Sequence, residues 1–179
     1  MLIHSASQLL TIAGPPQRGH ELGCLSIIPD GAVLIQGEKI IAVGTTAELQ
    51  QAYPQEEGFD ASGQVVMPGL VDPHTHLLWV GDRAREFEMR LEGKSYLEIL
   101  AEGGGILSTV RSTRQASLGE LLDETRPRLG EMLAYGTTTA EGKTGYGLQA
   151  ETELHMLQAL MLLDAEGPLE ILPTFLGAH

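Results

Sequence analysis

Two histidines one residue apart, His74 and His76, have the type and spacing that most directly indicate chemistry in this sequence. They end the run 65–76, whose apolar residues predict a buried β-strand. In a strand, residues i and i+2 point to the same side, so both imidazoles would face a common point. Two imidazoles on rigid backbone make half of a tetrahedral zinc-type site. The alternative is a surface pair at a strand end, and the apolar strand before them favours the metal site.

Residues 68–179 alternate between strand-like and helix-like segments, a pattern typical of parallel β/α units. Ser95 and Ser117 each precede a glutamate by three residues, which is the capping-box signature of a helix N-terminus. The segment 77–94 has no steady period, so we expect a loop there; it follows the first strand, where barrel enzymes keep their chemistry. We therefore expect strands at 69–74, 137–141 and 169–175, and helices at about 95–103, 106–115, 117–135 and 150–166.

The last of these helices carries apolar residues at helical spacing, and we expect them to form its buried face. Met156 and Met161 are expected to fill the core. Gly136 is the expected left-handed residue at the end of the preceding helix. The apolar stripe consists of Leu154, Leu157, Met161 and Leu162.

Residues 1–67 follow a different pattern, with several short strands and a single short helix. We expect a hairpin at 32–35 and 39–43, a helix at 47–51 and a turn at 59–63. Many short strands in so short a segment are typical of a small β-sandwich rather than of a barrel. We therefore treat this part as a portion of such a sandwich, completed by strands from elsewhere in the protein.

The remaining residues, 68–179, offer only three βα units. Three units cannot close an eight-stranded barrel, and an open parallel sheet would leave its edges and faces bare. We therefore expect this part to be the first, incomplete section of a barrel in a protein of about twice the length. The segment alone is expected to be inactive.

Composition excludes several functional classes. Eleven basic and 24 acidic residues give a net charge of −13, which repels nucleic acid. Hydrophobic residues make up 42% of the chain, yet no apolar run is long enough to cross a bilayer. The first residues lack the basic region of a signal peptide, and a lone Cys24 cannot form an internal disulfide. We therefore expect a cytoplasmic protein that binds neither nucleic acid nor membrane.

The strand that ends in His74 and His76 resembles the first barrel strand of the metal-dependent amidohydrolase superfamily. The resemblance implies an α/β fold: an amidohydrolase-type (β/α)8 TIM barrel, of which the first three βα units are present, and part of a small N-terminal β-sandwich. Within the superfamily, five ordered blocks resemble the imidazolonepropionase family. The blocks are 72–76 (DPHTH), 81–87 (GDRAREF), 103–106 (GGGI), 138–148 (TTAEGKTGYGL) and 174–179 (TFLGAH).

The resemblance implies ring-opening hydrolysis of 4-imidazolone-5-propanoate to N-formimidoyl-L-glutamate, a step of histidine degradation, by a metal-activated water. It implies one metal ion, zinc or iron, with His74 and His76 as ligands and the other ligands beyond residue 179. The partner is then a small-molecule substrate, and the resemblance leaves a homodimer open. Two alternatives remain: another cyclic-amide hydrolase or base deaminase of the superfamily, or a metal-binding fragment without catalysis.

Three further residues receive roles from the same resemblance. Arg83, Tyr146 and His179 match positions that contact the substrate, and His179 is also the expected catalytic residue that stabilises the oxyanion. A guanidinium can bind the substrate's propionate through two parallel hydrogen bonds. Tyr96 is a second phenol candidate, with packing as its alternative role. For Arg83 the alternative is a surface arginine paired with Asp82 or Glu86.

Lys143 and Asp72 have weaker assignments. In two-metal relatives a carboxylated lysine bridges the metals, but that lysine follows a later strand than Lys143 does. We therefore expect a salt bridge from Lys143 to Glu141, and a single metal. Asp72 faces the same side as His74 by the period of the strand. It is either an acceptor for a ligand imidazole or an ordinary strand-end cap.

Overall fold

The computed structural model describes residues 1–179 and shows two compact units, Met1–Pro68 and Gly69–His179. The boundary lies one residue after the one expected from the sequence. The two units are described separately. None of the helices combines the length and the apolar character needed to cross a lipid bilayer.

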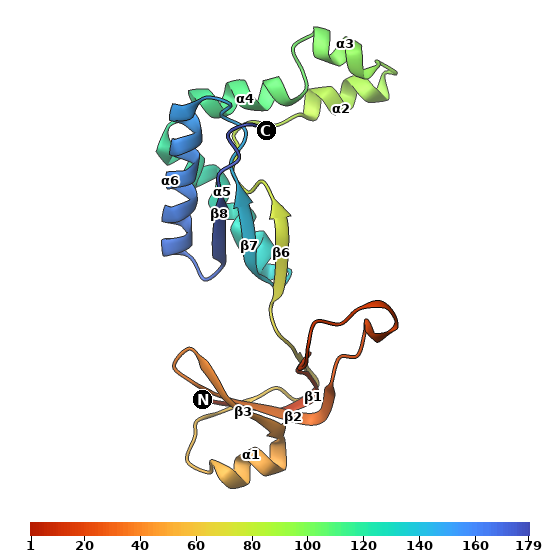
Figure 1. Cartoon of the computed structure of the whole chain (residues 1–179), viewed down its shortest axis with the longest axis vertical. Coiled ribbons are helices and arrows are strands. Elements are labelled where there is room, and N and C mark those ends of the chain that lie inside the picture. Colours follow the sequence, from red (N-terminus) through yellow and green to blue (C-terminus); the bar gives the residue numbers. More distant parts are fainter. The chain divides into compact units, whose positions relative to one another are not determined.

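The first unit is one five-stranded sheet with a helix (Figure 1). Leu2, Leu34 and Leu49 lie in its core. The threonine before the helix, Thr45, forms a capping box with Glu48, which fixes where the helix begins. The elements are β1 (Leu2–Leu10), η1 (Gly19–Glu21), β2 (Ile27–Gln36), β3 (Lys39–Thr45), α1 (Thr46–Ala52), β4 (Gly58–Asp60) and β5 (Val65–Val66), with sheet order β3-β2-β1-β4 and β5 also paired with β1.

The hairpin and the helix expected in this unit are confirmed, and β2 begins earlier than expected. The turn expected at 59–63 is wrong at its start, because Gly58–Asp60 form strand β4. These residues pair in parallel with the start of β1, from Leu2 to His4, and this long-range pairing cannot be read from local turn residues. One sheet and one helix do not test the β-sandwich, which stays a prediction.

The second unit contains a parallel sheet of three strands in the order β6-β7-β8 (Figure 1). Ser95 and Ser117 form the expected capping boxes, and Gly136 adopts φ +92° before β7. The elements are β6 (Leu70–Thr75), α2 (Ala84–Leu91), α3 (Tyr96–Ala101), α4 (Ile106–Gln115), α5 (Leu118–Ala134), β7 (Thr137–Lys143), α6 (Ala150–Glu166) and β8 (Glu170–Thr174). This parallel α/β arrangement agrees with the expected fold class, whereas barrel closure stays a prediction.

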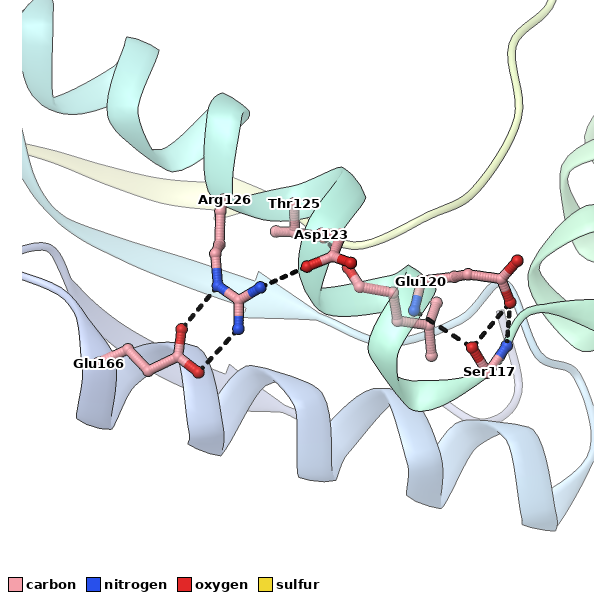
Figure 2. Close-up of polar contacts among 7 residues, drawn as sticks. Ser117, Glu120, Asp123, Thr125, Arg126 and Glu166 are labelled. Carbon is pink, nitrogen blue, oxygen red and sulfur yellow. Dashed lines mark hydrogen bonds and ion pairs between the residues drawn. The ribbon is translucent and has the colours of Figure 1, made fainter.

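Helices α5 and α6 pack on each other and on the sheet, and their core includes Leu121, Met156, Leu160 and Ile171. Arg126 of α5 joins them at the surface (Figure 2). Its Nε and Nη2 donate to the two carboxylate oxygens of Glu166 at 2.8 and 3.0 Å, the bidentate geometry that arginine favours.

Three expectations about this unit are wrong. The segment 77–94 contains a helix, α2, although it shows no steady sequence period. Strand β6 is not buried: Leu70 and Val71 are 47% and 63% exposed, because β6 is an edge strand of the sheet. The expected face of α6 is also wrong, since Leu154, Met161 and Leu162 are exposed. The buried face of α6 instead carries Met156, Ala159, Leu160 and Leu163, together with Thr152 and Glu153.

Candidate functional site

The carboxyl ends of the three parallel strands bring three of the predicted site residues together. His76 directly follows β6, Tyr146 follows β7, and His179 follows β8. The His76 and His179 rings stack with centroids 4.6 Å apart. The Tyr146 ring lies 4.9 Å from that of His76 and 5.7 Å from that of His179. Residues from strands distant in the sequence therefore form one aromatic cluster.

His74 lies beside this cluster and contacts the end of β7. Its Nδ1 is 3.0 Å from Nζ of Lys143. Lys143 also forms the expected ion pair with Glu141, so that prediction is confirmed. The other carboxylate oxygen of Glu141 accepts from Thr174 Oγ1 at 2.9 Å, which ties β7 to β8. Asp72 accepts the backbone N–H of His74 at 3.3 Å, as a strand-end cap does.

The two histidines fit part of a metal site. His76 Nδ1 is buried and has no hydrogen-bond partner. Burial lowers the pKa of His76, and the neighbouring His179 and Lys143 lower it further. These effects favour the neutral imidazole, which is the form that binds metals. The chain holds no group of three or more His, Cys, Asp or Glu side chains arranged for a metal, so the two histidines are an incomplete ligand set.

A cavity of about 840 Å³ opens beside the cluster. Arg83 borders it, with its side chain 44% exposed, and donates to Glu86 Oε2 at 2.5 Å. This hydrogen bond is the main cause that raises the pKa of Arg83, and the nearby phenols of Tyr96 and Tyr146 raise it less. The lining residues are His76, Trp79, Gly81, Asp82, Arg83, Thr109, Glu124, Arg128 and Tyr146.

The predicted substrate contacts therefore divide into two groups. Arg83 and Tyr146 border the same cavity as His76. Tyr96 is 54% exposed and does not line the cavity. The pairing of Arg83 with Glu86, considered from the sequence as the alternative, is present. It occupies one nitrogen of the guanidinium and leaves its other donors free for a ligand.

Sequence reasoning missed three residues around the site. Glu153 accepts three backbone N–H groups of the loop that carries Tyr146, and Arg114 donates to two carbonyls of the same loop. Arg128 lies 3.6 Å above the centre of the Trp79 ring at the cavity wall, a cation–π contact. An acidic residue in the first helical turn after a glycine-rich loop was the available signal for Glu153.

Comparison with known proteins identifies a matching family model and similar proteins. A model of the "Imidazolonepropionase-like composite domain, bacteria" matches residues 31–55. The imidazolonepropionase of Chloroflexus aggregans is 52% identical over 181 residues, which cover 100% of this chain and 42% of that protein. The chain thus spans about two fifths of the length of the curated relatives it matches.

Solved structures share the fold at low sequence identity. E. coli guanine deaminase superposes with a TM-score of 0.65 at 19% identity, covering 96% of this chain and 36% of that one. Atrazine chlorohydrolase from Arthrobacter aurescens TC1, complexed with zinc, gives a TM-score of 0.50 at 18% identity and covers 97% and 35%. From its sequence identity to curated relatives over its whole length, this chain belongs to the imidazolonepropionase family.

Proposed function

We propose that the protein carrying this chain hydrolyses 4-imidazolone-5-propanoate to N-formimidoyl-L-glutamate. One observation carries the proposal: 52% identity to an imidazolonepropionase over the whole chain. In the reaction, the oxygen of one water adds to the ring carbonyl carbon. The bond from that carbon to the ring nitrogen then breaks, and the nitrogen leaves with a proton. No oxidant or second substrate is needed.

The residues at the cavity match this substrate chemically. The propionate is an anion, and the free donors of Arg83 can bind it through charge-assisted hydrogen bonds. Tyr146 borders the same cavity as Arg83, and its ring lies against that of His76, so its hydroxyl can donate to the carboxylate or to the ring. His179 Nδ1 donates to the carbonyl of Gly145, which leaves Nε2 to donate to the developing oxyanion from the protonated ring, so we assign His179 the catalytic role. Tyr96 remains a second, outer phenol candidate for the substrate tail.

His74 and His76 would hold one metal ion, zinc or iron. The zinc in the related chlorohydrolase structure supports a divalent metal in general. When bound, such an ion supplies Lewis-acid polarisation and lowers the pKa of a coordinated water. The protein's contribution is that burial favours the neutral imidazole of His76, while the contact with Lys143 holds the ring of His74.

The architecture completes the proposal. We propose that Gly69–His179 is the first part of a (β/α)8 barrel and that Met1–Pro68 contributes to a small β-sandwich. The parallel order β6-β7-β8 and the fold shared with guanine deaminase support the barrel. In barrel enzymes the active site lies at the carboxyl ends of the strands, where this chain gathers His76, Tyr146 and His179.

The test uses the full-length protein, with product followed by mass spectrometry. We expect water-dependent conversion of the imidazolone to N-formimidoyl-glutamate, and no ammonia release from guanine. His74→Ala and His76→Ala should each lose most of the metal found in the wild type, because each removes one of about four ligands. His155→Ala, at an exposed position of α6, is the matched control and should retain it.

Deamination of guanine without imidazolone hydrolysis would replace this proposal by the deaminase alternative. Full metal content in both histidine variants would overturn the ligand assignment. Two equivalents of metal in the wild type would instead favour a metal-bridging role for Lys143.

A further inference from the structure

We propose that Glu153 and Arg114 are positioning residues that fix the loop 145–148, and through it Tyr146 and His179, at the substrate cavity. This inference rests on the proposed function and goes beyond it, because neither residue lines that cavity. Neither residue is in the set that the sequence predicted. Their role follows from the contacts they make with the backbone of this loop.

Glu153 binds the amide side of the loop. Its side chain is buried, with the residue 1% exposed. Oε2 accepts the N–H of Gly145 at 2.8 Å, and Oε1 accepts those of Gly147 and Leu148, both at 2.7 Å. Hydrogen bonds from N–H groups to a carboxylate are about twice as strong as neutral ones. Glu153 also lies in the first turn of α6, where the helix dipole stabilises a negative charge.

Arg114 binds the carbonyl side of the same loop from a different helix, α4. Its Nε donates to the carbonyl of Gly147 at 2.6 Å, and its Nη2 donates to that of Leu148 at 3.2 Å. Leu148 adopts φ +52°, a conformation that costs free energy in a residue with a side chain. An anion on the N–H groups and a cation on the carbonyls together hold the loop in this conformation.

The loop transmits its position to the site through Gly145. The carbonyl oxygen of Gly145 is 3.0 Å from His179 Nδ1. Gly145 adopts φ +119°, and a Cβ at this position would lie 2.9 Å from Cβ of His179. Tyr146 is the next residue, and its ring lies against His76 and His179. A shift of this loop would therefore move two of the proposed substrate contacts together.

Because Glu153 occupies the N–H groups of this loop, other groups must bind the substrate's carboxylate. A glycine-rich loop with free N–H groups can bind an anion directly. Here the N–H groups of Gly145, Gly147 and Leu148 are taken by Glu153. The substrate's carboxylate is therefore left to side chains, namely Arg83 and Tyr146. Glu153 acts through the loop rather than on the substrate.

The experiment compares full-length wild type with Glu153→Gln and Arg114→Ala. We expect kcat/KM for the imidazolone to fall about 10- to 100-fold in both, as for a small misplacement of reacting groups, while metal content stays unchanged. In a Tyr146→Phe background, Arg114→Ala should lower the logarithm of kcat/KM by less than half as much as it does in the wild-type background, because the two changes act on the same loop. Glu151→Gln, an exposed glutamate in the same helical turn, is the matched control and should remain within twofold of wild type.

Amide hydrogen exchange gives a readout independent of turnover. The amides of 145, 147 and 148 should exchange at least tenfold faster in both variants, whereas Arg111→Ala, which removes a guanidinium of α4 bound to Gly103, should not change them. If the wild-type protein did not hydrolyse the imidazolone, the proposed function would be refuted. The exchange rates would still test the loop contacts in that case. Unchanged exchange, or kcat/KM within twofold of wild type in Arg114→Ala, would overturn the inference even if Glu153→Gln fails to fold.

Discussion

The loop after β7 and the segment after β6 both border the candidate cavity, yet they are fixed in different ways. The loop that carries Tyr146 is held by the buried Glu153 and by Arg114, with five hydrogen bonds to its backbone. Arg83, on the other segment, is 44% exposed and is held through its side chain by Glu86. One side of the cavity is therefore fixed by its backbone and the other by an ion pair.

This difference matches the two tasks of the proposed reaction. Ring opening needs the reacting groups held within a fraction of an ångström, which a backbone-fixed loop provides. Recognition of a flexible propionate tolerates an exposed side chain as partner, and a guanidinium can bind two carboxylates at once. Glu86 binds a side chain and a backbone group at the same time. It is only 8% exposed, it accepts from the guanidinium of Arg83, and it accepts the N–H of Gly105 at 2.9 Å.

The largest effect is expected on the side of the cavity that is held by an ion pair, from Arg83→Met. Loss of a charge-assisted bidentate contact should cost about 2–4 kcal/mol in kcat/KM, or roughly 30- to 1000-fold, mainly through KM. Metal content should stay unchanged, since Arg83 does not contact either histidine ligand. Steady-state kinetics with the imidazolone, together with elemental analysis, provides the measurement.

Arg83→Lys sharpens the same test. An ammonium cannot reproduce the planar fork of a guanidinium, so this variant should recover only part of the loss. If Arg83 served only to pair with Glu86, kcat/KM of Arg83→Met would stay within about twofold of wild type, less than 0.5 kcal/mol. That result would remove Arg83 from the substrate site.

A smaller effect is expected from Glu86→Gln. An amide oxygen can still accept the N–H of Gly105, while the ion pair to Arg83 is lost. Because Arg83 is substantially exposed, the decrease in kcat/KM should be only about two- to fivefold. A loss as large as that of Arg83→Met would mean that Glu86 itself contacts the substrate.

The same variant makes a prediction about pH. The hydrogen bond from Arg83 is the main cause that lowers the pKa of Glu86 below its usual value of 4.5. A lowered folded-state pKa gives stability that is present above the unfolded pKa and lost as pH falls through the folded one. Thermal unfolding between about pH 6 and pH 3 should therefore show a steeper loss of Tm in wild type than in Glu86→Gln. Equal slopes would contradict this.

The parts of the fold that were predicted correctly are those with strong local signals in the sequence. The capping boxes at Ser95 and Ser117 placed α3 and α5 correctly, because the cap and its partner lie three residues apart in the sequence. The face of α6 could not be chosen from period, since apolar residues surround most of the helix. The buried hydrogen bonds of Glu153 and the packing of Met156 and Leu160 select the face instead.

The candidate site was predictable where strand ends define it. His76, Tyr146 and His179 follow three consecutive parallel strands, and the structure gathers their rings as this rule requires. Glu153 and Arg114 were missed because they act on backbone groups; the sequence offers a signal only for Glu153, an acidic residue in the first turn of α6 after a glycine-rich loop. The exposure of β6 was missed for a similar reason: burial depends on neighbours that a local apolar run does not specify.

The smallest effect is expected from a guanidinium with similar geometry but no link to the cavity. Arg126 binds Glu166 in bidentate fashion on the outer surface of α5 and α6 (Figure 2). Exposed pairs of this kind contribute little and are screened by salt. Arg126→Met should leave kcat/KM within twofold of wild type and lower Tm by no more than about 2 °C, with the difference shrinking at about 0.5 M salt. If Arg126→Met reduced kcat/KM as much as Arg83→Met, the loss at Arg83 could not be assigned to its place at the cavity.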